Sequence, residues 1–200
     1  MRRRCSLAGH PANVTNCRRS GSGGAGLSAY ADLRPGGSAE GSAVRPQARS
    51  LRLAPGEIRN VLAIEQRLFA HPWTLADFEW LSQDGRSLNL GLWKGEELVG
   101  YAVGAVDGPV FHLASLAVDG PCQRRGWGGR LLHASLERAA GRGCRSCRLE
   151  VRRSNVAAQR LYAKFEFVVD GVRRRFYTKP VEDAWLLSRP LPTEPESQTR

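Results

Sequence analysis

The 200-residue sequence contains no apolar run close to the roughly 20 residues that a membrane-spanning helix needs. Its N-terminus lacks the apolar core of a secretory signal, so we expect no membrane association. Lysine is scarce, since Lys94, Lys164 and Lys179 are the only three, and arginine supplies most of the formal net charge of +11. A basic chain favours anionic ligands, but no aromatic-interleaved basic motif accompanies the charge, so we do not expect direct nucleic-acid binding.

The cysteines are too scattered for a disulfide framework. There are five of them, Cys5, Cys17, Cys122, Cys144 and Cys147. An odd, scattered set is typical of a reducing compartment, so we expect a cytoplasmic protein. Cys144 and Cys147 form a lone CxxC, whereas a zinc site needs about four ligands. We therefore expect no metal, and we interpret the pair as small residues that lead into a strand.

Composition changes near residue 50. Residues 1–49 are rich in Gly, Ser, Ala and Arg, have no hydrophobic period and contain only two acidic residues, Asp32 and Glu40. Such a stretch cannot bury a core, so we expect a disordered tail followed by a folded domain at 50–191 and a flexible C-terminal tail at 192–200. Three explanations of the N-terminal tail stay open: a transit segment, a functional basic arm, or translation from a misplaced start.

Strand and helix periods alternate after residue 50. Helices are predicted around Ile58–Phe69, from Thr74 as N-cap with Asp77, after Gly129, and from Ser154 as cap through Phe165. Strands are predicted at Leu51–Leu53, Leu88–Trp93, Leu98–Val106, Phe111–Val118, Cys147–Val151, Phe167–Val172 and Ala184–Ser188. Strands interspersed with helices predict an α/β (α+β) domain with a mixed central sheet and helices on both faces.

The strongest chemical signal is a glycine-rich loop between a predicted strand and a predicted helix. It reads Gln123, Arg124, Arg125, Gly126, Trp127, Gly128, Gly129. Glycines let backbone N–H groups approach an anion, and a helix N-terminus adds partial positive charge, so the loop suits a pyrophosphate. A tight strand-to-helix turn is the competing interpretation. The loop matches neither a P-loop nor a dinucleotide-binding fingerprint.

Gln-Arg-x-Gly-x-Gly before a Leu-Leu helix resembles the coenzyme A loop of the GNAT acetyltransferases. The segment from Leu149 to Tyr162, which includes Glu150, Arg152, Ser154 and Asn155, resembles the RimI branch of that family, the ribosomal-protein alanine N-acetyltransferases. The resemblance covers about residues 51–191. It implies the GNAT fold and acetyl-CoA as co-substrate, with Leu116, Ala117 and Val118 pairing with the pantetheine arm of the co-substrate.

The resemblance also implies roles for three residues: Glu150 as general base, Tyr162 as general acid, and Asn155 as a residue that holds the co-substrate beside that tyrosine. The chemistry fits these residue types, because a reacting amine must lose a proton and a leaving thiolate must gain one. Without the motif, Glu150 would be read as a solvated carboxylate and Tyr162 as a core aromatic.

Two further segments match the family's substrate entrance. One is His71, Pro72 and Trp73, and the other is Phe176 and Tyr177; the competing interpretation is that the aromatic side chains are simply partly buried. One position departs from the family pattern: Glu166 stands where a glycine with positive φ would end the helix, at a cost of about 1 kcal/mol.

The resemblance therefore predicts an N-α-acetyltransferase for a protein N-terminus, with the N-terminal alanine of a small-subunit ribosomal protein as substrate. It gives no oligomeric state beyond a monomer or weak dimer. Two alternatives stay open: a GNAT enzyme for small amines or lysine side chains, and a non-catalytic acyl-CoA binding module.

Overall fold

The computed structural model describes residues 13–14, 45–82 and 85–192. Its strands are β1 (Asn13–Val14), β2 (Gln47–Ser50), β3 (Ser87–Lys94), β4 (Glu97–Asp107), β5 (Val110–Val118), β6 (Ser146–Arg152), β7 (Val168–Thr178) and β8 (Val181–Pro190). Its helices are α1 (Pro55–Leu68), α2 (Leu75–Ser82), α3 (Trp127–Ala140) and α4 (Val156–Lys164), and a short 3₁₀ turn, η2, spans Gly120–Cys122. None of the described helices is long and apolar enough to cross a membrane.

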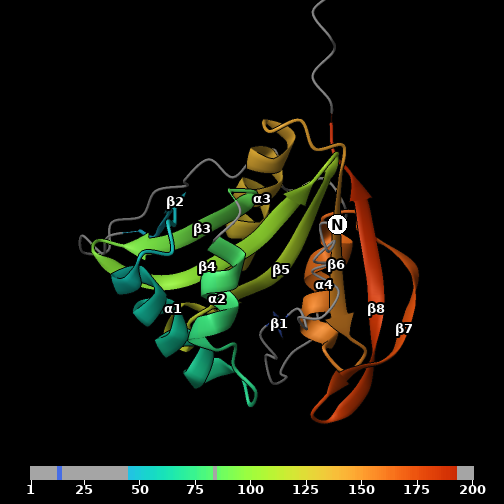
Figure 1. The fold of residues 1–200 in the computed structure, drawn as a ribbon, viewed down its shortest axis with the longest axis horizontal. Helices are drawn as coiled ribbons and strands as arrows, with labels where there is room; N and C mark the ends of the chain where they lie inside the picture. The colour runs from blue at the N-terminus through green and yellow to red at the C-terminus, as the bar shows by residue number, and fades with distance from the viewer. Residues whose placement is uncertain (1–12, 15–44, 83–84, 193–200) are drawn as a thin grey trace, which may run out of the picture.

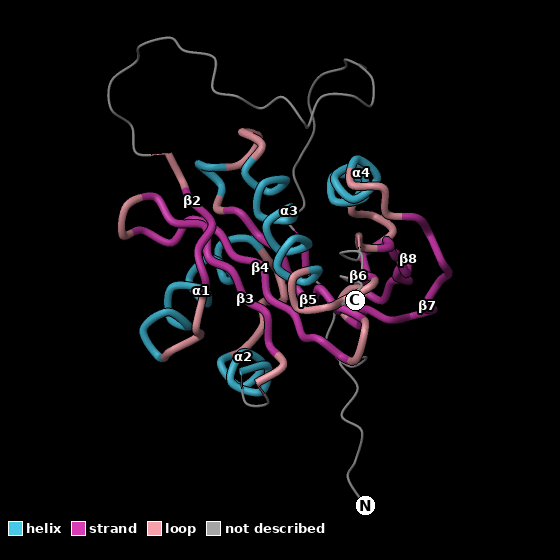
Figure 2. Tube along the Cα trace, turned by 90° about the horizontal axis from the view of Figure 1, so that it is seen from above, coloured by secondary structure: helices cyan, strands magenta, loops and turns pink. Residues whose placement is uncertain are grey.

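The strands form one mixed, eight-stranded sheet in the order β2-β3-β4-β5-β6-β8-β7, with β1 paired to β5. Helices α1 and α2 cover one face, where Ile58 and Phe78 pack with Tyr101 of β4. Helices α3 and α4 cover the other face, where Leu131 and Tyr162 belong to a second buried cluster (Figure 2). The predicted α/β architecture is confirmed.

Local capping explains where two helices begin. The Asp77 carboxylate accepts hydrogen bonds from the Thr74 N–H at 2.7 Å and the Thr74 hydroxyl at 2.8 Å, which confirms the predicted start of α2. The predicted cap of α4 was wrong. Asn155 is the N-cap, with Oδ1 accepting from the Ala158 N–H at 3.1 Å, while the Ser154 hydroxyl turns away to the Glu182 carboxylate at 3.0 Å.

The first strand of the main domain also differs from its prediction. Strand β2 ends at Ser50, and Leu51 and Leu53 are buried residues beyond it. Leu53 has φ +55, which is incompatible with extended backbone, so these two leucines reach the core from a loop. The predicted tail boundary at residue 49 falls inside β2, and β1 lies within the predicted tail; the rest of residues 1–44, and residues 193–200, lie outside the described residues.

The sheet divides between β5 and β6. Their parallel pairing joins only Val110–His112 to Ser146–Arg148, although β5 continues to Val118 and β6 to Arg152. The two strands separate beyond this pairing (Figure 1). Because β5 stays paired with β4 as far as Val118, the edge of β5 that faces away from β4 is left by β6 along its second half, where β1 pairs with Ser115 and Leu116.

Candidate active site

The glycine-rich loop follows β5 at the point where the sheet divides. The Gln123 side-chain amide donates to the Val118 carbonyl at 2.7 Å, which fastens the loop to the end of β5. Gly126 has φ +79 and is the N-cap of α3, so its backbone conformation favours glycine. The first N–H groups of α3 have no partner within the helix and are directed toward the loop.

Gly128 is a glycine for a different reason. It lies inside α3 without a positive φ, and an added Cβ would meet only Leu161 at 3.8 Å and Val118 at 3.9 Å. These are ordinary van der Waals contacts, so the fold would accept alanine at this position. A glycine that the fold does not require, at the start of a helix, favours the close approach of a ligand to the backbone.

Arginines surround the same loop. Arg124 and Arg125 are exposed, and the described part of the chain gives neither of them a carboxylate partner. The Arg130 guanidinium lies 4.8 Å from the centre of the Trp127 ring. At the start of the loop, Asp119 is held by Arg67 of α1 at 2.7 Å. No carboxylate of the described ranges neutralises Arg124 or Arg125, so this loop presents positive charge that suits an anionic ligand.

The strand before the loop contains the predicted pantetheine-binding residues. Leu116, Ala117 and Val118 are buried on β5. The outer edge of β5 is paired with β1 at Ser115 and Leu116. An acetyl-CoA arm that pairs with the same backbone groups must displace β1.

Glu150 lies on β6, with its side chain partly buried. Its Oε1 accepts a hydrogen bond at 2.9 Å from Nη1 of Arg173 on β7. Burial raises the pKa of Glu150 above its usual range, and the Arg173 guanidinium opposes that rise. A carboxylate whose pKa is shifted toward neutrality is a better match to a proton acceptor at physiological pH.

Tyr162 is fully buried on α4. Burial raises its pKa well above 10, so at neutral pH the phenol keeps its proton. It belongs to the cluster of Cys147, Leu149 and Val151, which alternate with Glu150 along β6, so Glu150 and Tyr162 come from opposite faces of that strand.

Tyr177 interacts electrostatically with both predicted catalytic residues. Glu150 is one of the charges that raise its pKa, after burial, and Tyr177 in turn contributes to the raised pKa of Tyr162. Sequence reasoning placed Tyr177 at the substrate entrance only. Its interaction with both groups could not be read from local spacing.

The predicted entrance residues at 71–73 differ in how far they are exposed to solvent. Trp73 is only 5% exposed and packs against Phe78, with ring centres 5.2 Å apart, whereas His71 is exposed and Pro72 is half-buried. The backbone N–H of Trp73 donates at 2.9 Å to the carboxylate of Glu65, a fully buried residue of α1. The Trp73 ring is therefore part of the core, and the loop offers His71 and Pro72 to solvent.

Glu65 is a positioning residue that was not among the site residues predicted from the sequence. Besides Trp73, its carboxylate accepts a hydrogen bond from the Tyr101 hydroxyl of β4, and Ser115 of β5 lies at 3.5 Å. This group connects the 71–73 loop to the strand that leads into the glycine-rich loop. A charged residue among the apolar positions of a buried helix face was the available signal.

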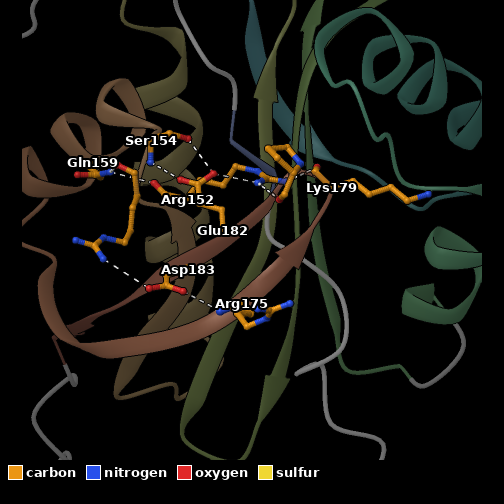
Figure 3. A network of polar contacts seen from close by, with 9 residues as sticks. Arg152, Ser154, Gln159, Arg175, Lys179, Glu182 and Asp183 are labelled. Atoms are coloured by element: carbon orange, nitrogen blue, oxygen red, sulfur yellow. Dashed lines mark hydrogen bonds and ion pairs between the residues drawn. The ribbon is translucent and has the colours of Figure 1, made fainter.

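The second entrance segment is held by a network of charged groups (Figure 3). The Arg152 guanidinium lies 3.9 Å from the centre of the Tyr177 ring and donates to the Lys179 carbonyl at 3.0 Å and the Glu182 carboxylate at 3.1 Å. Glu182 also accepts from the Ser154 N–H at 2.6 Å. Desolvation raises the pKa of Glu182, but the hydrogen bonds from Ser154 and Arg152 outweigh it, so the pKa is lowered.

This network fixes the hairpin between β7 and β8. Asp183 adds a 2.8 Å hydrogen bond from the Arg175 N–H (Figure 3). Tyr177 is fully buried beneath Arg152, while Phe176 is half-buried. The aromatic ring that this segment partly exposes is therefore that of Phe176, and the Tyr177 hydroxyl lies inside.

Two predicted residue groups have clear structural roles. Asn155 is 4% exposed and caps α4; its predicted contact with a co-substrate remains a prediction. Cys144 and Cys147 are buried free thiols, and burial raises the pKa of Cys147 to about 12, which makes it unreactive. The described residues contain no group of three or more His, Cys, Asp or Glu side chains placed to hold a metal ion.

Comparison with known proteins gives a consistent result. The acetyltransferase (GNAT) family profile matches residues 57–167. The [ribosomal protein bS18]-alanine N-acetyltransferase of Salmonella typhimurium is 36% identical over 130 residues, which are 64% of this chain and 87% of that protein.

Solved structures extend the similarity to the fold. The crystal structure of the ribosomal-protein-S18-alanine N-acetyltransferase from Escherichia coli superimposes with a TM-score of 0.69 at 31% identity, over 78% of this chain and 99% of that one. Ard1 from Thermoplasma volcanium gives a TM-score of 0.67 at 26% identity, over 74% of this chain and 99% of that one.

Proposed function

The chain belongs to the GNAT family of acetyltransferases, and on that basis we propose that it transfers the acetyl group of acetyl-CoA to the N-terminal alanine of a small-subunit ribosomal protein. Acetyl-CoA is the acetyl donor of the family. The choice of acceptor rests on the 36% identity to a relative that is named for that reaction, over 87% of the relative's length.

The loop from Gln123 to Gly129 is the proposed site for the pyrophosphate of acetyl-CoA. Gly128 leaves room beside the first turn of α3, and the guanidinium groups of Arg124 and Arg125, which pair with no carboxylate among the described residues, supply positive charge. The pantetheine arm would extend from this loop along β5 into the division between β5 and β6, where the backbone of Ala117 and Val118 can pair with its amides.

Acetyl transfer then needs three proton movements. The substrate α-amine, with a pKa of about 7.7–8, arrives mostly as ammonium at neutral pH and passes a proton to Glu150, directly or through water. The neutral amine attacks the thioester carbonyl, so a C–N bond forms, and the C–S bond then breaks. Tyr162, which keeps its proton because burial raises its pKa, donates it to the departing thiolate, and the second proton lost by the acylated nitrogen restores the phenol.

Because Glu150 and Tyr162 come from opposite faces of β6, they can serve one reacting centre only at the edge of that strand. The edge beside β5 is unpaired with β5 past Arg148, which is where their pairing ends. Tyr177 of β7 interacts electrostatically with both groups. This arrangement supports direct transfer without a covalent enzyme intermediate.

A competition assay tests the acceptor. Peptides that begin with alanine, serine, methionine or lysine, an alanine peptide with a blocked N-terminus, and spermidine compete at fixed acetyl-CoA, and mass spectrometry measures each product. We expect the free alanine peptide to be acetylated most. Preference for spermidine or an internal lysine would support a small-amine or lysine enzyme, and acetyl-CoA binding without turnover of any acceptor would support a binding module.

A further inference from the structure

One ion pair in the candidate site crosses an intervening strand. Glu150 lies on β6 and Arg173 on β7, and β8 runs between them. Neighbouring strands are about 4.8 Å apart, so the pair spans roughly twice that distance. The 2.9 Å bond between Arg173 Nη1 and Glu150 Oε1 is reached only because both side chains are long and extend over the same face of the sheet.

Arg173 also stands where the regular pairing of β7 ends. It pairs with Ala184 of β8, and the register then shifts before Tyr177 pairs with Glu182. The residues of this irregular stretch carry Phe176, the partly exposed ring of the second entrance segment. The Arg173 guanidinium lies 5.1 Å from the centre of that ring, so one side chain contacts both the predicted base and the entrance.

Other charged or titratable groups lie on the strands around Glu150: Arg148 and Arg152 on β6, Tyr177 on β7, Glu182 on β8 and His112 on β5. Arg152 is engaged by Glu182, and Arg148 and Arg173 both act on His112, whose pKa is lowered mainly by burial. Arg173 is the cation that forms a hydrogen bond to Glu150.

We propose that Arg173 is a positioning residue, whose guanidinium orients the Glu150 carboxylate, keeps it ionised and links it to the segment that carries Phe176. The inference rests on the proposed role of Glu150 as proton acceptor. Burial raises the pKa of Glu150 and Arg173 lowers it, so without the guanidinium the pKa would rise further. A protonated Glu150 cannot accept the proton of the amine.

The size of the pKa shift that Arg173 causes at Glu150 depends on how exposed the two side chains are to solvent. An opposite charge at this distance lowers a carboxyl pKa by about 1–3 units, and the effect is smallest where solvent screens the pair. The side chains of Arg173 and Glu150 are 35% and 23% exposed, so we expect about one unit. Arg173→Met should therefore move the acid limb of the kcat/KM profile up by about one pH unit.

Arg173→Lys separates charge from shape. Lysine keeps the positive charge but lacks the planar fork of the guanidinium, so the acid limb should stay near its wild-type pH while kcat falls. Arg86→Met is the matched control, since it removes an exposed arginine, just before β3, that forms an ion pair with Asp107 at the end of β4. A merely structural role for Arg173 predicts an equal loss at every pH in both Arg173 variants, and that result would overturn the proposal.

A titration that needs no turnover also tests whether Arg173 lowers the pKa of Glu150. The side-chain ¹³C carboxyl signal of Glu150, assigned by its loss in Glu150→Gln, is followed by NMR against pH in the wild type, Arg173→Met and Arg86→Met. We expect the midpoint to rise in Arg173→Met alone. An unchanged midpoint overturns the proposal even in an active enzyme, whereas a wild type that acetylates no peptide overturns the proposed function and leaves this measurement intact.

Discussion

Gly128→Ala separates the needs of the fold from those of the co-substrate. The added methyl group meets Leu161 and Val118 at 3.8 and 3.9 Å, which is ordinary packing distance, and Gly128 has no positive φ. Alanine is favoured over glycine inside a helix by about 0.5–1 kcal/mol. The variant should therefore unfold at the same urea concentration as the wild type or a slightly higher one.

The same methyl group stands where the proposed pyrophosphate approaches the backbone. A hydrogen bond to a charged group contributes about 1.5–3 kcal/mol, and each 1.4 kcal/mol is a factor of ten in Kd. Loss of one such bond predicts acetyl-CoA binding weaker by about 10- to 100-fold. Isothermal titration calorimetry on the folded variant measures this directly.

Two other glycines serve as controls. Gly56 is the second residue of α1, as Gly128 is of α3, and an added Cβ there meets nothing within 4 Å. Gly56→Ala should match Gly128→Ala in stability but leave the affinity unchanged. Gly126→Ala should lose about 1 kcal/mol of stability, because φ +79 is unfavourable for a side chain. A folded Gly128→Ala that binds acetyl-CoA with wild-type affinity would refute the proposed pyrophosphate site.

Four further changes have expected outcomes. Glu150→Gln should bind acetyl-CoA normally but slow turnover by about 10²–10⁴-fold at neutral pH. The defect should shrink as the pH rises above the amine's own pKa, because the substrate then arrives already deprotonated; a pH-independent kcat defect would argue for a positional role. Tyr162→Phe should lower kcat by about tenfold or more at unchanged acetyl-CoA affinity by calorimetry. Glu166→Gly should raise the free energy of unfolding by about 1 kcal/mol in urea, since Glu166 has φ +61 and its 3.4 Å pair with Arg189 is too exposed to offset this. Removal of residues 1–44 should leave kcat intact, since every predicted site residue lies beyond residue 70, and should not weaken acetyl-CoA binding, since it also removes β1 from the edge of β5.

Local signals in the sequence predicted much of the fold. The apolar runs of β3, β4 and β5 are buried on a central part of the sheet, so their boundaries agree with prediction within one or two residues. Glu166 adopts the positive φ that its place after α4 predicted. The Glu166 and Phe167 N–H groups bond to the Ala163 and Tyr162 carbonyls, which satisfies the helix end in the way a glycine usually does.

The edge of the sheet was harder to predict. Strand β7 runs to Thr178 and β8 begins at Val181, so both are longer than expected. Strand β7 is an edge strand with mostly exposed residues, so no hydrophobic alternation marks its length. The predicted strand ended at Val172, before the arginine run at 173–175 that continues β7.

Site residues that depend on tertiary contacts could not be predicted from spacing. Arg173 is 23 positions from Glu150 and two strands away in the sheet, so no local pattern joins them. Trp73 and Tyr177 match the family's entrance residues, but their burial depends on Glu65 and Arg152, which reach them from other elements. The resemblance identified the two entrance segments, but which of their side chains face solvent depends on tertiary packing.

The most direct test of the account is the N-terminus of the ribosomal substrate in cells. Small-subunit ribosomal proteins are purified from the parent strain, from a strain lacking this gene, and from that strain carrying either the wild-type gene or Glu150→Gln, and their N-terminal peptides are sequenced by mass spectrometry. The account predicts an alanine N-terminus that is acetylated in the parent, free after deletion, restored by the wild type and not restored by Glu150→Gln. An unchanged set of acetylated N-termini after deletion would contradict it.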